Sequence, residues 1–321
     1  MTVDTVLVAY NSQDMIGRAL DLAGQLGGRA VVVDHGDGAS AVIAATRGAI
    51  AIHDPSNPGF GTGQNRGLSF TDSDIVLLCN PDAEILPEAV QAGAALLRGR
   101  PDVAALQGVI VNRLTGRPER SAGVEVGPVH LMGRAIGAKG LLRSPWVASV
   151  ARRTSTLQDH AQRIPDGPQE VDTLAATAVL VRRSAFEAVG GFDETYFLYG
   201  EDLDLSNRLR RAGWKLLSVP EVFAVHTSGG SADSDWQREA NWWKGTMQFG
   251  ATRWTGAAWS LAVSAAAIRW ARLAVRHPRH ATATFSAMVG DGLRRHRAVA
   301  AYRRPLLAGS TGPDHGSIHV S

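Results

Sequence analysis

A dense group of ionisable and phenolic side chains occupies residues 190–205, GGFDETYFLYGEDLDL. Five acids and two tyrosines share these sixteen residues with two phenylalanines. Apolar surroundings desolvate a carboxylate and raise its basicity, which a general base requires. Glu201 and Asp202, directly after Gly200, are therefore candidate catalytic residues. The alternative is an ordinary helix N-terminus, where acidic side chains are stabilised by the helix dipole.

A second candidate group, Asn80, Pro81 and Asp82, follows the apolar run DIVLLC. A carboxylate at the end of a buried strand can hold a divalent cation that bridges phosphates. Asn, Pro and Asp are also common turn residues, so a plain turn is the alternative. His226 follows the apolar run VFAV and precedes a polar segment, which favours a position at a site. An isolated histidine of this kind is also common in cores and loops.

The segment NPGFGTGQN places Gly59, Gly61 and Gly63 at every second position. Glycines before a helix allow a diphosphate to approach the backbone N–H groups closely. The spacing matches neither a Walker loop nor the GxGxxG dinucleotide fingerprint. The glycines alone are also compatible with an ordinary loop and helix cap.

Short apolar runs alternate with helical patterns in the first third of the chain. Four runs predict buried strands, at residues 5–9, 30–33, 49–53 and 74–79. Three segments predict helices, at residues 15–25, 63–70 and 87–98. Continuous apolar strands separated by helices indicate a parallel sheet covered on both faces. Ligands of such sheets bind at the carboxyl ends of the strands. The polar positions at these ends are Tyr10, Asn11, Asp34, residues 57–63 and Asn80 to Asp82.

The second half of the chain is less regular. Strands are predicted at residues 103–111, 172–182, 214–219 and 222–225. Helices are predicted at residues 184–189 and 203–212. Residues 113–140 are rich in Gly and Arg and predict a loop, and residues 144–160 predict a loose helix. Loops of this kind often carry binding specificity.

The composition bounds the classes of function. A net charge of only +3 gives no general basis for binding a polyanion, so we expect no nucleic-acid partner. The single cysteine, Cys79, cannot form an intrachain disulfide, which favours a reducing cytoplasm. The N-terminal residues lack a basic region before their apolar run, so we expect no signal peptide. The longest weakly polar run, residues 254–268, is too short to span a bilayer.

The C-terminal part from residue 236 onward has a helical pattern and a strong positive charge. Ten arginines and a single acid, Asp291, lie between Arg253 and Arg304. An apolar face with arginines at its end is typical of a helix on an anionic membrane surface, such as the inner face of the cell membrane. The alternatives are a helix packed on the preceding domain and a partner-binding helix, for example in a homodimer. Residues 306–321 have the composition of a disordered end.

The motifs taken together resemble a known family. VAYN, VVVDHGDGAS, NPGFGTGQNRGL, LLCNPDAEIL, the segment from AVLVRRSAF to EDLDLSNRLRRAGW, and VFAVH occur in this order. The series is similar to the family 2 inverting glycosyltransferases, and most similar to actinobacterial rhamnosyltransferases that use dTDP-rhamnose. The resemblance covers about residues 3–275. It implies an α/β fold of the GT-A type, with a Rossmann-like mixed sheet, helices on both faces and a C-terminal helical extension.

The resemblance also implies a domain organisation. Residues 1–235 would form the catalytic domain, with a nucleotide-sugar-binding half at 1–112 and an acceptor-binding half at 113–235. Residues 236–305 would form the basic helical extension. The partners would be a nucleotide-sugar donor and a lipid-linked or small-molecule acceptor.

Individual roles follow from the matching positions. Asp34 would hydrogen-bond the nucleotide base. The nucleotide sugar would be bordered by Ala9, Tyr10, Asn11, Gly61, Gln64, Asn65, Arg66, Asn80, Pro81 and Asp82. Asp82 would ligate Mg²⁺ or Mn²⁺ with the help of His226. Asp202 would be the general base, and the acceptor would contact Phe197, Tyr199, Gly200 and Glu201.

Three positions depart from the family pattern. Asn80 stands where many relatives carry an aspartate, which weakens the predicted metal site. Gln64 replaces a common arginine, which weakens the predicted diphosphate contact. Thr173 and Ala176 stand where close relatives tend to have Trp and Gly, which leaves the acceptor open.

Further functions stay open as alternatives. One is a transferase of the same fold that uses a UDP or GDP sugar. Another is a non-catalytic protein that binds a nucleotide sugar, although such a binder would not need both Asp82 and Asp202. A nicotinamide-dependent oxidoreductase is excluded because GxGxxG is absent after the first strand.

Overall fold

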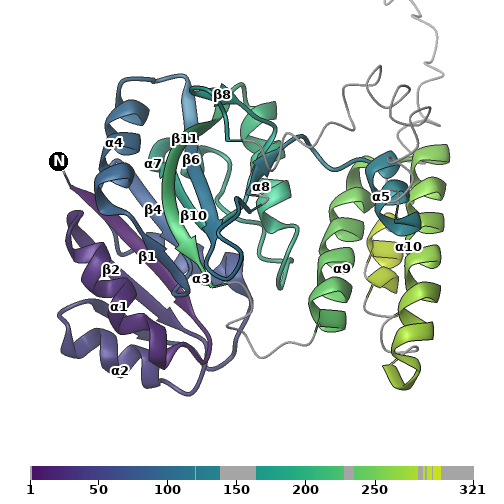
Figure 1. The fold of residues 1–321 in the computed structure, drawn as a ribbon, viewed down its shortest axis with the longest axis horizontal. Coiled ribbons are helices and arrows are strands. Elements are labelled where there is room, and N and C mark those ends of the chain that lie inside the picture. Colours follow the sequence, from purple (N-terminus) through teal and green to yellow (C-terminus); the bar gives the residue numbers. More distant parts are fainter. Residues whose placement is uncertain are drawn as a thin grey trace, which may run out of the picture.

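A nine-stranded mixed sheet forms the centre of the N-terminal domain (Figure 1). The computed structural model describes residues 2–119, 121–137, 164–227 and 235–280, with residues 285, 288–290 and 292–297. The helix predicted at 144–160 and the tail 306–321 lie outside the described residues. The strand order is β3-β2-β1-β4-β10-β6-β11-β5, and β8 pairs with β11.

The first half of the sheet has the parallel arrangement that the sequence predicts. Its strands are β1 (Val3–Ala9), β2 (Gly27–Asp34), β3 (Ile50–His53) and β4 (Ile75–Cys79). All of their pairings are parallel, because helices connect them. The carboxyl ends of these strands therefore meet at one edge of the sheet.

The second half of the sheet is mixed. Its strands are β5 (Ala83–Ile85), β6 (Val103–Asn112), β8 (Gln169–Glu170), β10 (Ala178–Arg182) and β11 (Lys215–His226). Strand β10 lies antiparallel between β4 and β6, so the uniformly parallel sheet inferred from the first third of the chain does not extend here. The two strands predicted at 214–219 and 222–225 form one strand, β11, whose register shifts between Ser218 and Val222. Pro220 lies in this interval and has no N–H to donate to the ladder.

The segment 172–182, predicted as one strand, forms two strands. It is divided into β9 (Thr173–Leu174) and β10, and β9 pairs with β7 (Ala122–Gly123) in a separate small sheet. The interruption has a local cause, because the backbone between the two strands bonds elsewhere. The Thr177 carbonyl accepts the N–H of Asn80 at 2.9 Å, and the Ala175 N–H donates to Ser121 at 2.7 Å.

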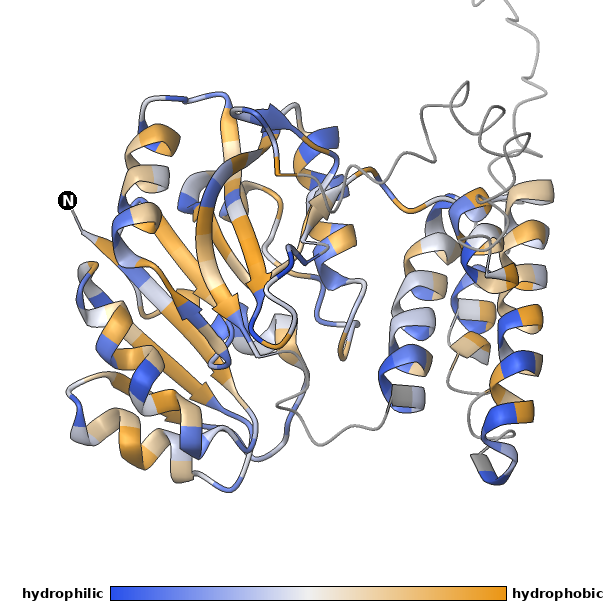
Figure 2. Cartoon of the chain, viewed as in Figure 1, coloured by the Kyte–Doolittle hydropathy of each residue, from blue (hydrophilic) through white to orange (hydrophobic). Residues whose placement is uncertain are grey.

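Helices cover both faces of the sheet. One face carries α1 (Gln13–Gly24), α2 (Ala39–Thr46) and α4 (Pro87–Arg98). The other face carries α3 (Phe60–Leu68), α7 (Arg183–Ala188) and α8 (Glu201–Arg211). Alternate residues of a strand enter opposite cores: Leu77 packs in the first and Val76 in the second. Figure 2 shows these strands as the most hydrophobic part of the domain.

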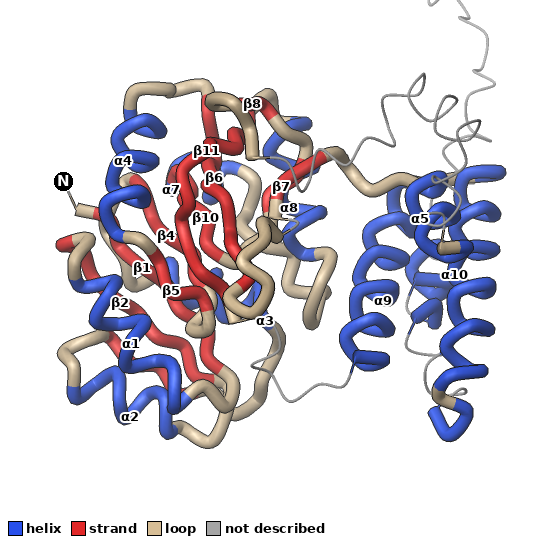
Figure 3. Tube along the Cα trace, viewed as in Figure 1, coloured by secondary structure: helices blue, strands red, loops and turns tan. Residues whose placement is uncertain are grey.

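Further helices form a separate cluster beside this domain (Figure 3). They are α5 (Pro128–Ile136), α9 (Asp235–Arg253) and α10 (Gly256–Arg276), followed by a short 3-10 helix η4 (Pro278–His280) and by the helical residues 288–290 and 292–297. Their own hydrophobic core is centred on Trp243 and Met247. The loop predicted at 113–140 thus contains a helix, α5, which packs on α10. No helix in the described part of the chain is long and apolar enough to cross a bilayer.

Ionic contacts attach α9 to α8. The Nη2 atom of Arg253 lies 2.6 Å from Oδ1 of Asp204, and these side chains are 15% and 6% exposed. Asp204 Oδ2 also accepts a hydrogen bond from Nε of Arg208 at 2.6 Å. Arg253 Nε donates to Asn207 at 3.1 Å. The helical cluster is therefore connected to the helix that begins with the candidate catalytic acids.

This buried contact should matter for stability. In Arg253→Met, Arg208 is the only described cation that still pairs with Asp204. We expect the free energy of unfolding, measured by urea denaturation, to fall by about 2–3 kcal/mol. Arg47→Met is the matched control, because its ion pair with Asp21 joins side chains that are 43% and 60% exposed. That variant should lose less than about 1 kcal/mol. Equal losses in the two variants would show that Arg253 does not anchor α9.

Candidate active site

The carboxyl ends of β1 and β2 form one side of the candidate site. Ala9 ends β1 and is fully buried, whereas the Tyr10 side chain is 55% exposed. Asn11 follows with a φ of 51°, a left-handed conformation that asparagine tolerates. Gly36, in the loop after β2, lies against Asn11. The structure therefore places the predicted nucleotide-lining residues at one edge of the sheet.

Asp34 is engaged by its own loop. Its Oδ1 atom accepts the N–H of Gly36 at 2.8 Å, and its Oδ2 atom accepts the N–H of Ala41 at 3.0 Å. The side chain is 1% exposed. The carboxylate thus holds the start of α2 against the sheet. A nucleotide base could use only the lone pairs that these two bonds leave available.

The helix predicted from Gly63 begins three residues earlier, so part of the glycine-rich segment is helical instead of a loop. Helix α3 begins at Phe60, so that Gly61 and Gly63 lie inside it. A Cβ at Gly61 would contact Phe192, and one at Gly63 would contact His35 and Val8, all within 3.0 Å. The physical reason for these glycines is close packing of α3 on its neighbours. They do not form a phosphate-cradling loop before the helix.

The three residues after Gly63 have different environments. Gln64 is completely buried, and neither polar atom of its amide has a hydrogen-bond partner among the described residues. Such a group is costly unless a ligand or water satisfies it. The side-chain amide of Asn65 instead forms two hydrogen bonds with the backbone of Phe192. It accepts the N–H of Phe192 at 2.8 Å and donates to the Phe192 carbonyl at 2.9 Å. Arg66 is paired with Asp54 at 2.7 Å. Gln64 is therefore the member of this set whose amide has no partner among the described residues, but a ligand could reach it only if the packing around it changed.

Asp82 and His226 lie in contact although they are distant in the sequence, because β5 pairs antiparallel with β11 and puts Ala83 opposite His226. His226 Nε2 is 3.2 Å from Asp82 Oδ2, and His226 Nδ1 is 2.7 Å from Oε2 of Glu119. Burial lowers the pKa of His226, but hydrogen bonds to both carboxylates outweigh this and raise it to about 9. Glu119 is a functional candidate that the sequence motifs did not indicate.

Asn80 and Pro81 connect β4 to this group. Pro81 is buried, and the Oδ1 atom of Asn80 is buried without a hydrogen-bond partner in the described structure. Asn80 Oδ1 and the Asp82 carboxylate are possible ligands of a divalent cation, and the His226 imidazole becomes one when it releases the proton that its raised pKa retains. Within the described ranges, no cluster of three or more His, Cys, Asp or Glu side chains is arranged to hold a metal. A cation here would need ligands from a bound phosphate, which is usual for Mg²⁺.

Glu201 and Asp202 are the first two residues of α8. Glu201 is 5% exposed, and its Oε2 atom lacks a partner within the residues that the structure describes. Burial and the neighbouring carboxylate of Asp202 raise the pKa of Glu201 to about 8. Burial also raises the pKa of Asp202, although Oδ1 accepts the N–H of Leu203 at 2.8 Å. At neutral pH Glu201 therefore keeps its proton, and the raised pKa of Asp202 makes its carboxylate a stronger base than a free aspartate.

The raised pKa of Glu201 has a consequence for stability. As pH rises above 4.5, the unfolded chain releases this proton, whereas the folded chain keeps it until about pH 8. Folding stability should therefore fall across this window, by at most about 1.4 kcal/mol per pH unit. Glu201→Gln removes this dependence. Urea denaturation of both proteins between about pH 5 and 8 measures their free energies of unfolding. As pH rises, the free energy of unfolding of the variant should increase relative to that of the wild type. A constant difference would mean that Glu201 is already ionised in the folded protein.

The loop before these acids has strained backbone. Tyr199 has a φ of 64° and Gly200 a φ of 89°, both in the left-handed region. Phe197 is 48% exposed, and its carbonyl accepts the N–H of Phe60 at 2.9 Å. A Cβ added to Gly245 of α9 would overlap the Tyr199 carbonyl. Helix α9 therefore presses directly on the turn that positions Glu201 and Asp202.

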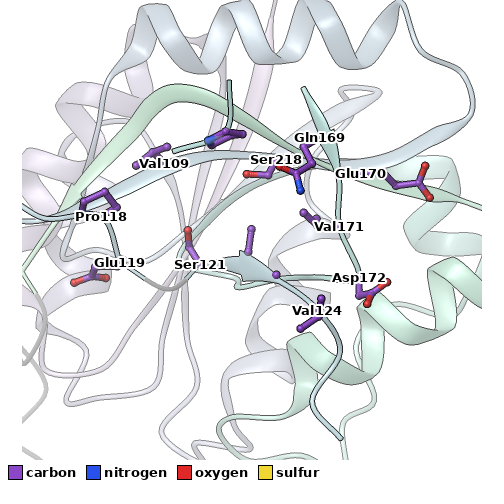
Figure 4. Close-up of a pocket in the computed structure, with 13 residues that line it drawn as sticks. Val109, Pro118, Glu119, Ser121, Val124, Gln169, Glu170, Val171, Asp172 and Ser218 are labelled. Carbon is purple, nitrogen blue, oxygen red and sulfur yellow. The ribbon is translucent and has the colours of Figure 1, made fainter. Parts of the chain in front are cut away.

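A pocket of about 300 Å³ is lined by residues of β6, β7, β8 and β11 and of the loops beside them (Figure 4). Glu119, Glu170 and Asp172 are among the residues that line it. Asp172 is 2.8 Å from Nη2 of Arg210, and Glu119 binds His226. Two of its three acids are thus engaged in contacts with the chain. The pocket contains neither Asp202 nor Asp82.

Comparison with known proteins identifies the family. The family model described as "Glycosyltransferase like family 2" matches residues 2–248. The chain belongs to this family. The resemblance inferred from the motifs is confirmed, and the protein is a glycosyltransferase with an α/β fold of the GT-A type.

Individual relatives agree with this assignment. Over 228 residues the glycosyltransferase is 28% identical to the N-acetylglucosaminyl-diphospho-decaprenol L-rhamnosyltransferase of Mycobacterium tuberculosis, covering 62% of this chain and 69% of that protein. A segment of 56 residues, 17% of this chain, is 50% identical to 21% of the rhamnosyltransferase WbbL of Escherichia coli. The family 2 glycosyltransferase is thus related to rhamnosyltransferases.

A solved structure supports the fold. The mannosyltransferase PcManGT of Pyrobaculum calidifontis, in complex with GDP-Man and Mn²⁺, superposes with a TM-score of 0.52 and 14% identity. The match covers 94% of this glycosyltransferase and 86% of that chain. At this identity the likeness establishes the GT-A fold alone.

Proposed function

We propose that this glycosyltransferase transfers L-rhamnose from dTDP-rhamnose to a hydroxyl group of a prenyl-diphosphate-linked sugar. The observation that carries the proposal is the paired burial of Glu201 and Asp202 at the start of α8, directly after a strained turn. The relationship to rhamnosyltransferases supports the sugar, and the acceptor named for the mycobacterial relative supports the acceptor class.

Asp202 acts as the general base in this proposal. It accepts the proton of the acceptor hydroxyl while the oxygen forms a bond to the anomeric carbon of the donor sugar. The bond from that carbon to the diphosphate breaks at the same time, and dTDP leaves. Attack opposite to the leaving group inverts the anomeric configuration. Protonated Glu201 adds no negative charge beside the base, and burial makes the Asp202 carboxylate a stronger proton acceptor.

A divalent cation fits the residues at the end of β4. Asp82 and His226 would hold it, and Asn80 Oδ1, which lacks a partner among the residues described, is a further candidate ligand. Bound Mg²⁺ or Mn²⁺ would neutralise the charge that develops on the departing diphosphate. Glu119 orients the His226 ring through Nδ1, as carboxylates commonly do for metal-binding histidines.

Donor binding can be measured without an acceptor. Thermal unfolding is followed with dTDP, UDP and GDP sugars, each with and without Mn²⁺. We expect dTDP-rhamnose with Mn²⁺ to raise the Tm most, because a ligand that binds only the folded state stabilises it. Asp82→Asn should remove most of the Mn²⁺-dependent part of this shift. Asp37→Asn, an exposed acid in the loop after β2, is the control and should retain it.

The outcomes separate the parts of the proposal. A larger shift with a UDP or GDP sugar would contradict the donor. An unchanged Mn²⁺ effect in Asp82→Asn would contradict the metal site. No shift with any of the nucleotide sugars would contradict the proposed nucleotide-sugar chemistry as a whole.

A further inference from the structure

The helical cluster contains a pocket of about 500 Å³. Helices α5, α9 and α10 line it, together with Tyr199 from the loop before the catalytic acids. Four of its lining residues are arginines, at positions 134, 238, 269 and 276, whereas Glu239 is the single acid among them. Four positive charges and one negative charge leave an excess of three, so the lining favours an anion.

Glu239 does not cancel this excess. Its Oε2 atom is 2.7 Å from Nη2 of Arg134, and its Oε1 atom is 2.9 Å from Nε of Arg269. Burial raises the pKa of Glu239, but these arginines outweigh burial and lower it overall. The acid is therefore ionised and holds two of the arginines in place. Arg276 lies at the exposed end of α10 and adds its charge to the same pocket.

The pocket is also coupled to the catalytic loop. Tyr199 lines it and precedes Asp202 by three residues. The Tyr199–Gly200 backbone lies against Gly245 of α9, the helix that supplies Arg238 and Glu239. Trp236 and Trp242 complete an aromatic wall. A ligand in the pocket would therefore lie beside the turn that positions the base, at a site built from different residues than the donor edge around Asp82.

We propose that this pocket binds the diphosphate group of a prenyl-diphosphate-linked acceptor. This proposal rests on the acceptor class proposed above. Guanidinium groups bind phosphate oxygens through paired, charge-assisted hydrogen bonds. The acceptor sugar joins this diphosphate and reaches past Tyr199 toward Asp202. Two tryptophans of the lining, Trp236 and Trp242, offer apolar surface beside the arginines for the prenyl chain. A free phosphate would have no use for that surface.

Equilibrium binding tests this site without turnover. The probe is N-acetylglucosamine linked through diphosphate to a short prenyl chain, and inorganic pyrophosphate is the comparison. Arg238→Gln and Arg276→Gln should each weaken probe binding about tenfold, the usual effect of losing one charge-assisted hydrogen bond. Arg279→Gln removes the same charge from an exposed position in η4, outside the pocket, and should change binding less than about twofold. Binding of dTDP-rhamnose should stay unchanged in all three variants.

Each outcome decides the inference. Normal probe binding in Arg238→Gln and Arg276→Gln would overturn it, even if the wild-type protein transfers rhamnose. Pyrophosphate that binds as tightly as the probe, with the same arginine dependence, would mean that the pocket takes a free anion, and would overturn the lipid-linked source. Arginine-dependent probe binding without any transfer would support the pocket and contradict the proposed function instead.

Discussion

Asp202→Asn should reduce kcat by about a thousandfold, within the range typical for loss of a general base. The amide is nearly isosteric with the carboxylate but cannot take the proton of the acceptor hydroxyl. The α8 N-terminus and its contact with the Leu203 N–H should be preserved, so the Kd for the donor should change little. Initial rates at saturating substrate, with donor binding measured separately, test both statements.

Glu187→Gln is the matched control for this variant. Glu187 lies in α7, its side chain is 57% exposed, and it forms a 3.5 Å ion pair with Arg183. Its loss should leave kcat within about twofold of the wild type, because exposed ion pairs contribute little. Near-normal turnover in Asp202→Asn would contradict the role of Asp202 as base.

Gly245→Ala should have the second large effect, although residue 245 touches no reacting atom. The added Cβ would overlap the Tyr199 carbonyl, so α9 or the Tyr199–Gly200 turn must move. A displacement of about 1 Å at a catalytic group can reduce turnover about a hundredfold. Overpacking should also lower the free energy of unfolding by about 1–3 kcal/mol. Steady-state kinetics and urea denaturation measure the two effects.

Gly24→Ala provides the comparison, because nothing lies within 4 Å of a Cβ at this position at the end of α1. It should leave turnover unchanged and should not destabilise the protein, since alanine favours helix more than glycine. If Gly245→Ala also has normal kcat, α9 does not position the catalytic acids.

The parallel strands could be predicted within a few residues from their sequence. Runs such as IVLLC are apolar at every position because both faces of β4 are buried, and this pattern is typical of a strand inside a covered parallel sheet. Helix α4 begins at Pro87 as expected, since proline is tolerated at a helix start. The position of β10 between β4 and β6 could not be predicted. Strand order depends on tertiary contacts that leave no periodic signal in one sequence.

The site was predictable where a motif ends a strand. The motifs place Asp82 and His226 at strand ends, and the pairing of β5 with β11 brings them together. Glu119 carried no comparable signal, because it lies in a segment rich in Gly and Arg without regular periodicity. Gly245 was also missed, since a glycine within an aromatic-rich helix gives no hint of the backbone that it approaches. Both residues act through contacts between distant parts of the chain.

The configuration of the product decides whether Asp202 assists a direct displacement. The protein is incubated with dTDP-rhamnose, Mn²⁺ and the short prenyl-diphosphate-linked N-acetylglucosamine, and NMR of the product determines the configuration at the new anomeric centre. We expect one added rhamnose with the configuration inverted relative to the donor, and loss of this product in Asp202→Asn. A product with retained configuration, or inverted product formed equally well by Asp202→Asn, would contradict direct displacement assisted by Asp202.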